Sequence, residues 1–360
     1  MAAQFWRDKR VFITGHTGFK GSWLALWLHR MGAQVYGYSL PAPTNPSLFH
    51  LARLQNCVDT TTGDVRDLKH LSETMAKVRP EIVFHLAAQP LVRESYQAPI
   101  DTFSTNIMGT AHLLEAVRHT PSVRSVVIVT SDKCYENREW LWGYREDDPM
   151  GGHDPYSSSK GAAELITSAY RRSYFSKDTD NCAAVATVRA GNVIGGGDFS
   201  FDRLLPDFIR ALEKQEAVNI RNPHAIRPWQ FVLEPLAGYL QLAKRLYEAG
   251  QLYATGWNFG PADTDLQTVA QLCATFNHSL QKHDVEPIEV RLQSGVNSTP
   301  DEAAFLRLDI SKARQRLNWI PKLELYTALE LTAQWYAGYI NNEDLRSLSE
   351  SQIEFYQNLE

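Results

Sequence analysis

The chain has 360 residues, of which 44% are hydrophobic and 21% charged, a composition that fits one large globular domain plus a smaller one. Its 36 Lys and Arg residues are outnumbered by 41 Asp and Glu residues, and the net charge of −5 argues against nucleic acid or a membrane surface as a partner. No uncharged apolar stretch reaches the roughly 20 residues of a membrane-spanning helix, and the charged N-terminus does not resemble a signal peptide, so we expect a cytoplasmic protein.

The four cysteines are widely separated in the sequence, at Cys57, Cys134, Cys182 and Cys273. They form no Cys-x-x-Cys pair, and no histidine lies at a spacing suited to zinc. We therefore expect reduced thiols and no metal site.

The first predicted strand, residues 11–13, runs directly into a turn that carries glycines at positions 15, 18 and 21. Apolar residues at helical spacing follow over 23–31, Gly32 ends that helix, and a second strand covers 35–38. Such glycines let a backbone approach a pyrophosphate, and the helix N-terminus supplies N–H donors. The unit predicts a dinucleotide site, although a glycine turn that only packs strand on helix would look similar.

The predicted cofactor contacts come from this turn and from the ends of the next strands. His16 and Lys20 stand where most such turns carry neutral residues; either contacts the cofactor phosphates, or Lys20 projects into solvent. No Arg follows the second strand, which favours NAD over NADP. Asp64 is placed for the adenine edge or for a helix N-cap. The full set is Gly15, His16, Thr17, Gly18, Phe19, Lys20, Gly21, Ser39, Asp64, Val65, Leu86, Ala87, Ala88, Tyr156 and Lys160.

After a proline-rich loop at 40–46, the pattern predicts a helix over 68–78, a strand over 82–86 and a helix over 106–118. The next strand, 124–130, has a continuous β-branched run typical of burial on both faces of a parallel sheet. It stops at Ser131, Asp132 and Lys133. Because ligands of open α/β sheets bind beyond the carboxyl ends of strands, we expect an active site there.

A helix over 156–174 carries Tyr156 and Lys160 one turn apart on the same face. Taken alone, such a pair is often an ordinary surface pair. A further buried strand, 184–188, is followed by a glycine-rich segment up to Asp198. The alternation of strands and helices predicts an α/β fold with a doubly wound parallel (Rossmann) sheet.

Regularity decreases after about residue 195, which indicates a smaller C-terminal α/β lobe that binds the substrate. Helices are predicted over 204–214, 236–249, 268–277, 310–317 and 328–340, with a basic, aromatic loop at 221–230 and another loop at 294–303. We assign 1–193 and a return segment of about 231–262 to the NAD-binding domain. Residues 194–230 and 263–360 form the predicted nucleotide-sugar lobe.

Three features together (the glycine turn, Tyr156-x-x-x-Lys160 and Ser131) resemble the extended short-chain dehydrogenase/reductase family over essentially the whole chain, including His85–Ala88 and Asn106. Within it, Ser131-Asp132-Lys133 is similar to the nucleotide-sugar 4,6-dehydratases, most of which carry Glu where this chain has Lys133. This lysine, with the segments 18–22, 86–93, 189–198 and 227–230, resembles the dehydratases that act on CDP-glucose.

The resemblance implies conversion of CDP-D-glucose to CDP-4-keto-6-deoxy-D-glucose and water, in deoxysugar and lipopolysaccharide (O-antigen) biosynthesis. Tightly held NAD would be reduced and reoxidised in each turnover. It also implies a homodimer built through the helices at 106–118 and 156–174. The preference for cytosine rests on the resemblance alone, since no residue in the sequence specifies the base.

In this scheme Tyr156 takes the proton of the sugar 4-hydroxyl, Ser131 holds that oxygen, and Lys160 with the cationic nicotinamide lowers the pKa of Tyr156. Asp132 would be the acid that releases water from C6, with its pKa raised by burial, and Lys133 would be the C5 base. Predicted substrate contacts are Gln89, Asn192, Arg227 (to the diphosphate) and Trp229 (stacking, or else a core residue). Arg189 is a weaker diphosphate candidate, or part of an ion pair between the two lobes.

Two rival functions share part of this pattern. Another nucleotide-sugar 4,6-dehydratase or a 4-epimerase would use the same Tyr156 and Lys160, but an epimerase has no need of Asp132 and Lys133. A non-catalytic NAD-sensing module would keep the glycine turn without needing Tyr156 or Lys160.

Overall fold

The computed structural model describes residues 3–176, 183–220, 222–262, 267–292 and 306–359. Its centre is a seven-stranded parallel sheet of order β11-β6-β5-β4-β1-β2-β3. The strands are β1 (Arg10–Thr14), β2 (Gln34–Ser39), β3 (Asp59–Thr62), β4 (Ile82–His85), β5 (Ser125–Val129), β6 (Ala184–Ala190) and β11 (Gly256–Phe259).

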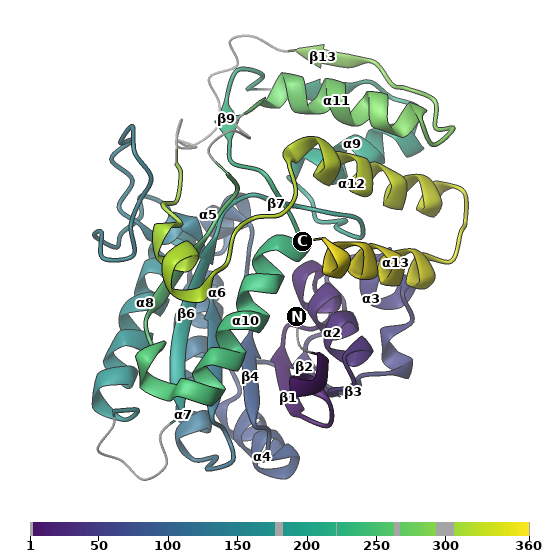
Figure 1. Cartoon of the computed structure of the whole chain (residues 1–360). Coiled ribbons are helices and arrows are strands. Elements are labelled where there is room, and N and C mark those ends of the chain that lie inside the picture. Colours follow the sequence, from purple (N-terminus) through teal and green to yellow (C-terminus); the bar gives the residue numbers. More distant parts are fainter. Residues whose placement is uncertain (1–2, 177–182, 221, 263–266, 293–305, 360) are drawn as a thin grey trace.

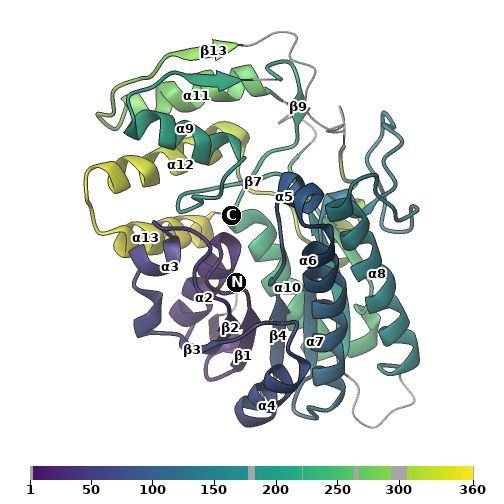
Figure 2. The same cartoon turned by 180° about the vertical axis from the view of Figure 1, so that it is seen from behind.

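Helices cover both faces of this sheet (Figures 1 and 2). In the central strands, alternate residues pack into two cores: in β1, Val11 and Ile13 lie in one, whereas Phe12 lies in the other. The first core includes α2 (Phe19–Arg30) and α10 (Leu233–Ala249), and the second includes α4 (Leu68–Val78), α7 (Gly109–Arg118) and α8 (Pro155–Ser173). The predicted doubly wound sheet is confirmed.

The predicted helix over 156–174 matches α8 to within one residue. The side chain of Asp154 caps it by accepting a hydrogen bond from Ser157 N at 2.9 Å, and Pro155 occupies its first turn. The predicted helix over 106–118 is more complex, because α7 is preceded by a π-helical turn (Ser104–Met108) and by α5 (Val92–Gln97) and α6 (Pro99–Phe103), both of which the periodicity missed.

A smaller layer lies above the carboxyl ends of the strands (Figure 1). It contains α9 (Leu204–Glu213), α11 (Val269–Gln281) and α12 (Leu325–Ile340). Three two-stranded pairings accompany them: β7 (Val193–Ile194) with β10 (Gln230–Phe231), β8 (Val218–Ile220) with β13 (Val290–Leu292), and β9 (Ile226–Arg227) with β12 (Gln267–Thr268). The predicted helix over 310–317 is a shorter π-helical turn, Ala313–Leu317, and the predicted loop at 294–303 lies outside the described residues.

The last helix, α13 (Leu345–Asn358), was not predicted. It packs beside α2, where the rings of Tyr356 and Trp27 meet edge to face at 5.7 Å. The end of the chain thus contacts the first helix of the sheet as well as α12.

Among the described residues, Cys57, Cys134 and Cys273 are free thiols, and Cys182 lies outside that part of the chain. The same described segments contain no cluster of metal-ligating side chains and no helix with the length and apolar character needed to cross a bilayer.

Candidate active site

The glycine turn after β1 has a geometry that only glycine permits at two positions. Gly15 has φ of +74°, and a Cβ there would lie 2.6 Å from the backbone nitrogen of Ala87. A Cβ on Gly21 would lie 2.1 Å from the carbonyl oxygen of Gly15. The N-cap residue of α2, Gly18, makes no side-chain cap hydrogen bond, so the first turn of α2 suits an anionic phosphate group. These features fit the pyrophosphate of a dinucleotide.

His16 is buried, and its ring lies between β2 and β3. Its Nε2 is 3.2 Å from Thr60 Oγ1, its ring meets Phe49 edge to face, and a Cβ on Gly37 would collide with it. Burial lowers the pKa of His16 to about 4, so the ring is neutral at pH 7. Its Nδ1 is buried without a hydrogen-bond partner among the described residues, and the phosphate contact by His16 stays a prediction.

Lys20 lines the main cavity of the protein together with Asp132, Asp198 and Arg203. Burial, followed by the charge of Arg203, lowers the pKa of its amine to about 8, while the two carboxylates act in the opposite direction. The alternative in which Lys20 projects into solvent is therefore wrong. Lys20, in the first turn of α2, thus brings a positive group to the same cavity as Asp132.

The other predicted cofactor residues border the ends of β2, β3 and β4. Ser39 Oγ is 2.8 Å from Thr17 Oγ1, which joins the end of β2 to the glycine turn. Asp64 is bound by the guanidinium of Arg66, whose hydrogen bonds lower the pKa of that carboxyl. The N-cap of α4 is Asp67, so the alternative of Asp64 as a cap is wrong. Val65 is buried against Gly109, and Leu86, Ala87 and Ala88 directly follow β4.

Residues 131–134, named here the Ser131 turn, follow β5 directly and contain a short 3-10 helix. Ser131 Oγ donates to Asp132 Oδ1 at 3.0 Å, and the backbone nitrogen of Lys133 donates to the same oxygen at 2.9 Å. Asp132 is 8% exposed, and burial raises its pKa against the opposing charge of Lys133. The predicted direction of this shift is confirmed.

Tyr156 lies at the start of α8, where its backbone nitrogen donates to Ser95 Oγ at 3.2 Å. Burial raises the pKa of its phenol to about 12, and the nearby Ser131 hydroxyl is the largest opposing influence. Lys160 turns its amine toward the Val129 carbonyl at 3.4 Å, and burial lowers its pKa to about 8. Within the chain itself, the predicted lowering of the Tyr156 pKa by Lys160 is therefore not observed.

Ser131, Asp132, Lys133 and Tyr156 line one cavity of about 410 Å³ between the sheet and the smaller layer, whereas Lys160 is not among its lining residues. Its lining comes from segments that follow β1, β4, β5 and β6 and from the smaller layer, at the carboxyl edge of the sheet. It includes the predicted residues Ser131, Asp132, Lys133, Tyr156, Asn192, Arg227 and Trp229. The ends of the parallel strands and the smaller layer thus bring together residues as far apart in the chain as Lys20 and Trp229.

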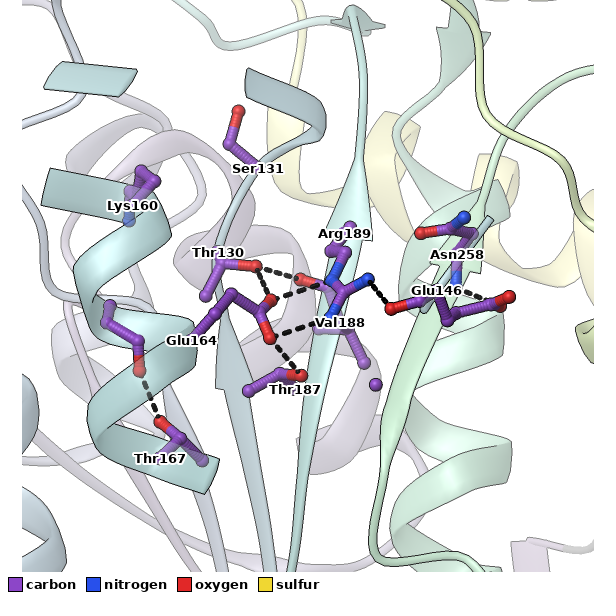
Figure 3. A network of polar contacts seen from close by, with 12 residues as sticks. Thr130, Ser131, Glu146, Lys160, Glu164, Thr167, Thr187, Val188, Arg189 and Asn258 are labelled. Atoms are coloured by element: carbon purple, nitrogen blue, oxygen red, sulfur yellow. Dashed lines mark hydrogen bonds and ion pairs between the residues drawn. The ribbon is translucent and has the colours of Figure 1, made fainter. Parts of the chain in front are cut away.

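Two predicted ligand contacts belong elsewhere. Gln89 uses its amide inside the protein, donating to Leu91 O at 3.0 Å and to Thr102 Oγ1 at 2.8 Å, and it does not line the cavity. Arg189 forms a buried ion pair with Glu164 on α8 (Figure 3). It is therefore neither a diphosphate ligand nor a link between lobes.

Several residues that line the cavity were not predicted from the sequence. Arg203 forms an ion pair with Asp198 at 2.7 Å, and Arg93 pairs with Asp202 at the same distance. The charged pattern Asp198, Asp202 and Arg203, just after the glycine-rich segment, could have indicated them. The contribution of Arg93 depends on α5, which the periodicity did not reveal.

Comparison with known proteins agrees with this geometry. Residues 12–332 match the family model described as GDP-mannose 4,6 dehydratase. The chain is 52% identical to CDP-glucose 4,6-dehydratase of Salmonella typhimurium, covering 98% of this chain and 97% of that protein. It is 27% identical to dTDP-glucose 4,6-dehydratase of Xanthomonas campestris, covering 90% and 92%.

Among solved structures, UDP-glucuronic acid 4-epimerase from Bacillus cereus, in complex with UDP-glucuronic acid and NAD, superposes with a TM-score of 0.75. The two chains are 21% identical, and the match covers 92% of this chain and 99% of the epimerase. This likeness supports the same fold.

Proposed function

Because the chain belongs to the GDP-mannose 4,6-dehydratase family, we propose that it is the enzyme that converts CDP-D-glucose to CDP-4-keto-6-deoxy-D-glucose and water. One observation carries the reaction class: Asp132 and Lys133 line the same cavity as Tyr156. An epimerase would use Tyr156 but would not need Asp132 and Lys133. The 52% identity to a CDP-glucose 4,6-dehydratase over nearly the whole chain supports the substrate.

We assign NAD as the resident cofactor. The glycine turn and the uncapped first turn of α2 would hold its pyrophosphate, with Ser39 and Asp64 toward the adenosine end. No Arg follows β2 to receive a 2′-phosphate, which favours NAD over NADP. When bound, NAD would accept the hydride from C4 of the sugar and return it to C6.

The oxidation half uses Tyr156, Ser131 and Lys160. The Tyr156 oxygen removes the proton of the 4-hydroxyl, and Ser131, whose hydroxyl opposes the rise in the Tyr156 pKa, orients the sugar oxygen. The chain alone holds the phenol neutral, with a pKa of about 12. The positive charge needed to make it a base must therefore come from the oxidised nicotinamide together with Lys160.

The elimination half uses Lys133 and Asp132. A 4-ketone acidifies the C5 hydrogen, so Lys133 can take that proton as the C5–C6 double bond forms. Asp132 donates its proton to the leaving C6 hydroxyl, which departs as water. The raised pKa of Asp132 supports this role, because the acid must hold its proton before it acts. Lys133 then returns a proton to C5.

The nucleotide diphosphate requires cations in a protein of net charge −5. Arg227 lines the cavity with Asn192 and Trp229, and a guanidinium can bridge two phosphate oxygens. We assign the diphosphate to Arg227, with Asn192 beside it and Trp229 against the base or ribose.

The direct test is incubation of the protein with NAD and CDP-glucose, followed by detection of the 4-keto sugar through its chromophore in alkali. The UDP, GDP and dTDP analogues are compared at equal concentration, and Tyr156→Phe serves as the inactive control. We expect product from CDP-glucose ahead of the other three. A folded, NAD-loaded protein that yields no 4-keto-6-deoxy sugar would contradict the dehydratase; interconversion of C4 epimers would favour the rival function.

We also propose a homodimer. The outer face of α6 to α8 exposes large apolar side chains, including Ile100, Met108 and Leu165. A helical face of this kind is suited to packing against a second copy. Sedimentation should give twice the chain mass, and Leu165→Lys should reduce it to the monomer mass.

A further inference from the structure

A buried ion pair lies directly behind the cavity, and the proposed reaction gives it no role. Glu164 and Arg189 have side chains only 5% and 4% exposed. Arg189 Nε donates to Glu164 Oε1 at 2.8 Å, and Nη2 donates to Oε2 at 2.9 Å (Figure 3). Apolar side chains of similar volume would fill this space without the desolvation of two charges, so the pair needs a role beyond packing.

The pair is bonded to the residues on both sides of the Ser131 turn. Thr130, which precedes the turn, donates from Oγ1 to Glu164 Oε1 at 2.6 Å. Tyr135, which follows the turn, accepts at its hydroxyl oxygen a hydrogen bond from Arg189 Nη1 at 2.5 Å. One ion pair thus holds both ends of the segment that carries Asp132 and Lys133.

Glu164 of this ion pair lies on α8, the helix that also carries Tyr156 and Lys160. Glu164 lies on α8 one turn after Lys160 and two turns after Tyr156, on the same side of the helix. On the far side, the Tyr135 hydroxyl donates to Asn258 Oδ1 at 2.7 Å, and Asn258 is fully buried in β11. The network therefore runs from α8 across β6 to β11.

We propose that Glu164 and Arg189 are positioning residues that fix the Ser131 turn relative to Tyr156 and Lys160, so that elimination follows oxidation before the 4-keto sugar accumulates. Neither side chain lines the cavity, so both act through Thr130 and Tyr135. This inference rests on the proposed dehydratase reaction. It adds a structural reason why the two half-reactions are coupled.

Thr130→Val and Thr187→Val form a matched test. Both remove a buried hydroxyl that donates to the same carboxylate, at 2.6 Å to Oε1 and at 2.7 Å to Oε2, but only Thr130 adjoins the turn. The readouts are kcat and, after rapid quenching, the ratio of CDP-4-keto-glucose to CDP-4-keto-6-deoxyglucose. Thr130→Val should lower kcat about tenfold and raise that ratio, because small displacements of reacting groups are costly. Thr187→Val should stay close to wild type.

A second pair covers the possibility that Thr130→Val acts through the cavity or fails to fold. Tyr135→Phe removes the hydroxyl that Arg189 holds, and Tyr356→Phe removes a buried hydroxyl bonded to Glu234 far from the site. Only Tyr135→Phe should raise the intermediate ratio, with KM unchanged. Equal ratios within both pairs would overturn the positioning role. Wild-type turnover in the same experiment tests the dehydratase function separately.

Discussion

Two buried carboxylates near the end of β5 behave in opposite ways. Asp132 is 8% exposed and Glu164 is 5% exposed. Burial raises the pKa of Asp132, and its neighbours only partly oppose this. Burial would also raise the pKa of Glu164, but the Arg189 guanidinium and the hydroxyls of Thr130 and Thr187 bring it below the ordinary value. The environment of Asp132 favours its protonated form, whereas that of Glu164 favours the carboxylate.

A third carboxylate shows which partner makes the difference. Glu234 is 1% exposed and accepts hydrogen bonds from Lys322 N, Leu323 N and the Tyr356 hydroxyl at 2.7–2.8 Å. Burial nevertheless raises its pKa to about 7. Three hydrogen bonds without a closely bound cation do not offset desolvation, whereas the bidentate guanidinium beside Glu164 does.

The largest expected effect comes from removing the proton that Asp132 carries. Asp132→Asn should lower the rate of 4-keto-6-deoxy sugar formation roughly thousandfold, because an amide cannot protonate the leaving hydroxyl. Oxidation at C4 should persist, so the 4-keto sugar should be found after quenching. Glu234→Gln, which also replaces a buried carboxylic acid by its amide but lies outside the cavity, should keep wild-type turnover. Loss of both half-reactions in Asp132→Asn would contradict the role assigned to this residue.

The second effect is on stability and concerns the charge of the Glu164 carboxylate. Glu164→Gln leaves the Arg189 guanidinium buried without a counter-ion, and we expect the free energy of unfolding to fall by about 3 kcal/mol or more. Urea denaturation at pH 7 and fixed protein concentration measures it. The double variant Glu164→Leu with Arg189→Met should recover much of this loss, since no buried charge remains. Equal stabilities of single and double variants would argue against a charge effect.

A third test uses the pH dependence of stability. The folded pKa of Glu234, about 7, exceeds the ordinary value of 4.5, so the folded protein binds the extra proton between these limits. Stability relative to Glu234→Gln should therefore fall by about 3 kcal/mol as the pH rises from 4.5 to 7. Urea midpoints across this range measure the difference. A difference that is independent of pH would show that the carboxyl does not titrate in this window.

The smallest effect comes from a cation near Asp132. The charge of Lys20 lowers the pKa of Asp132, so Lys20→Met should raise it. If the acid form of Asp132 is needed, activity is lost as the pH rises through that pKa, and the alkaline limb of the kcat profile should move up by less than about one unit. Thr17→Val, in the glycine turn just before α2, should leave the alkaline limb of the kcat profile unchanged. A limb that moves down would contradict the assignment.

Local sequence signals predicted the sheet and most of the site. A glycine turn after a strand, a β-branched run that stops at Ser131, and Tyr156 spaced one turn from Lys160 each follow from short-range physics. Residues bonded within their own segment, such as Gln89 with Leu91, were misjudged, because a polar side chain after a strand can satisfy the backbone instead of a ligand. The helix α13 was not predicted because most of its residues are polar and exposed and only a narrow face is buried.

By itself, the sequence determined the alternation of strands and helices over most of the sheet, the dinucleotide turn and the chemical groups at the end of β5, because these depend on residues adjacent in the chain or one helical turn apart. Only the tertiary structure decided that Lys20 lines the cavity, that the His16 ring lies outside its lining, and that Arg189 pairs with Glu164. It also decided that Asp132 and Glu164 differ in pKa direction. Burial and the charges around a group come from segments distant in sequence, and only packing brings those together.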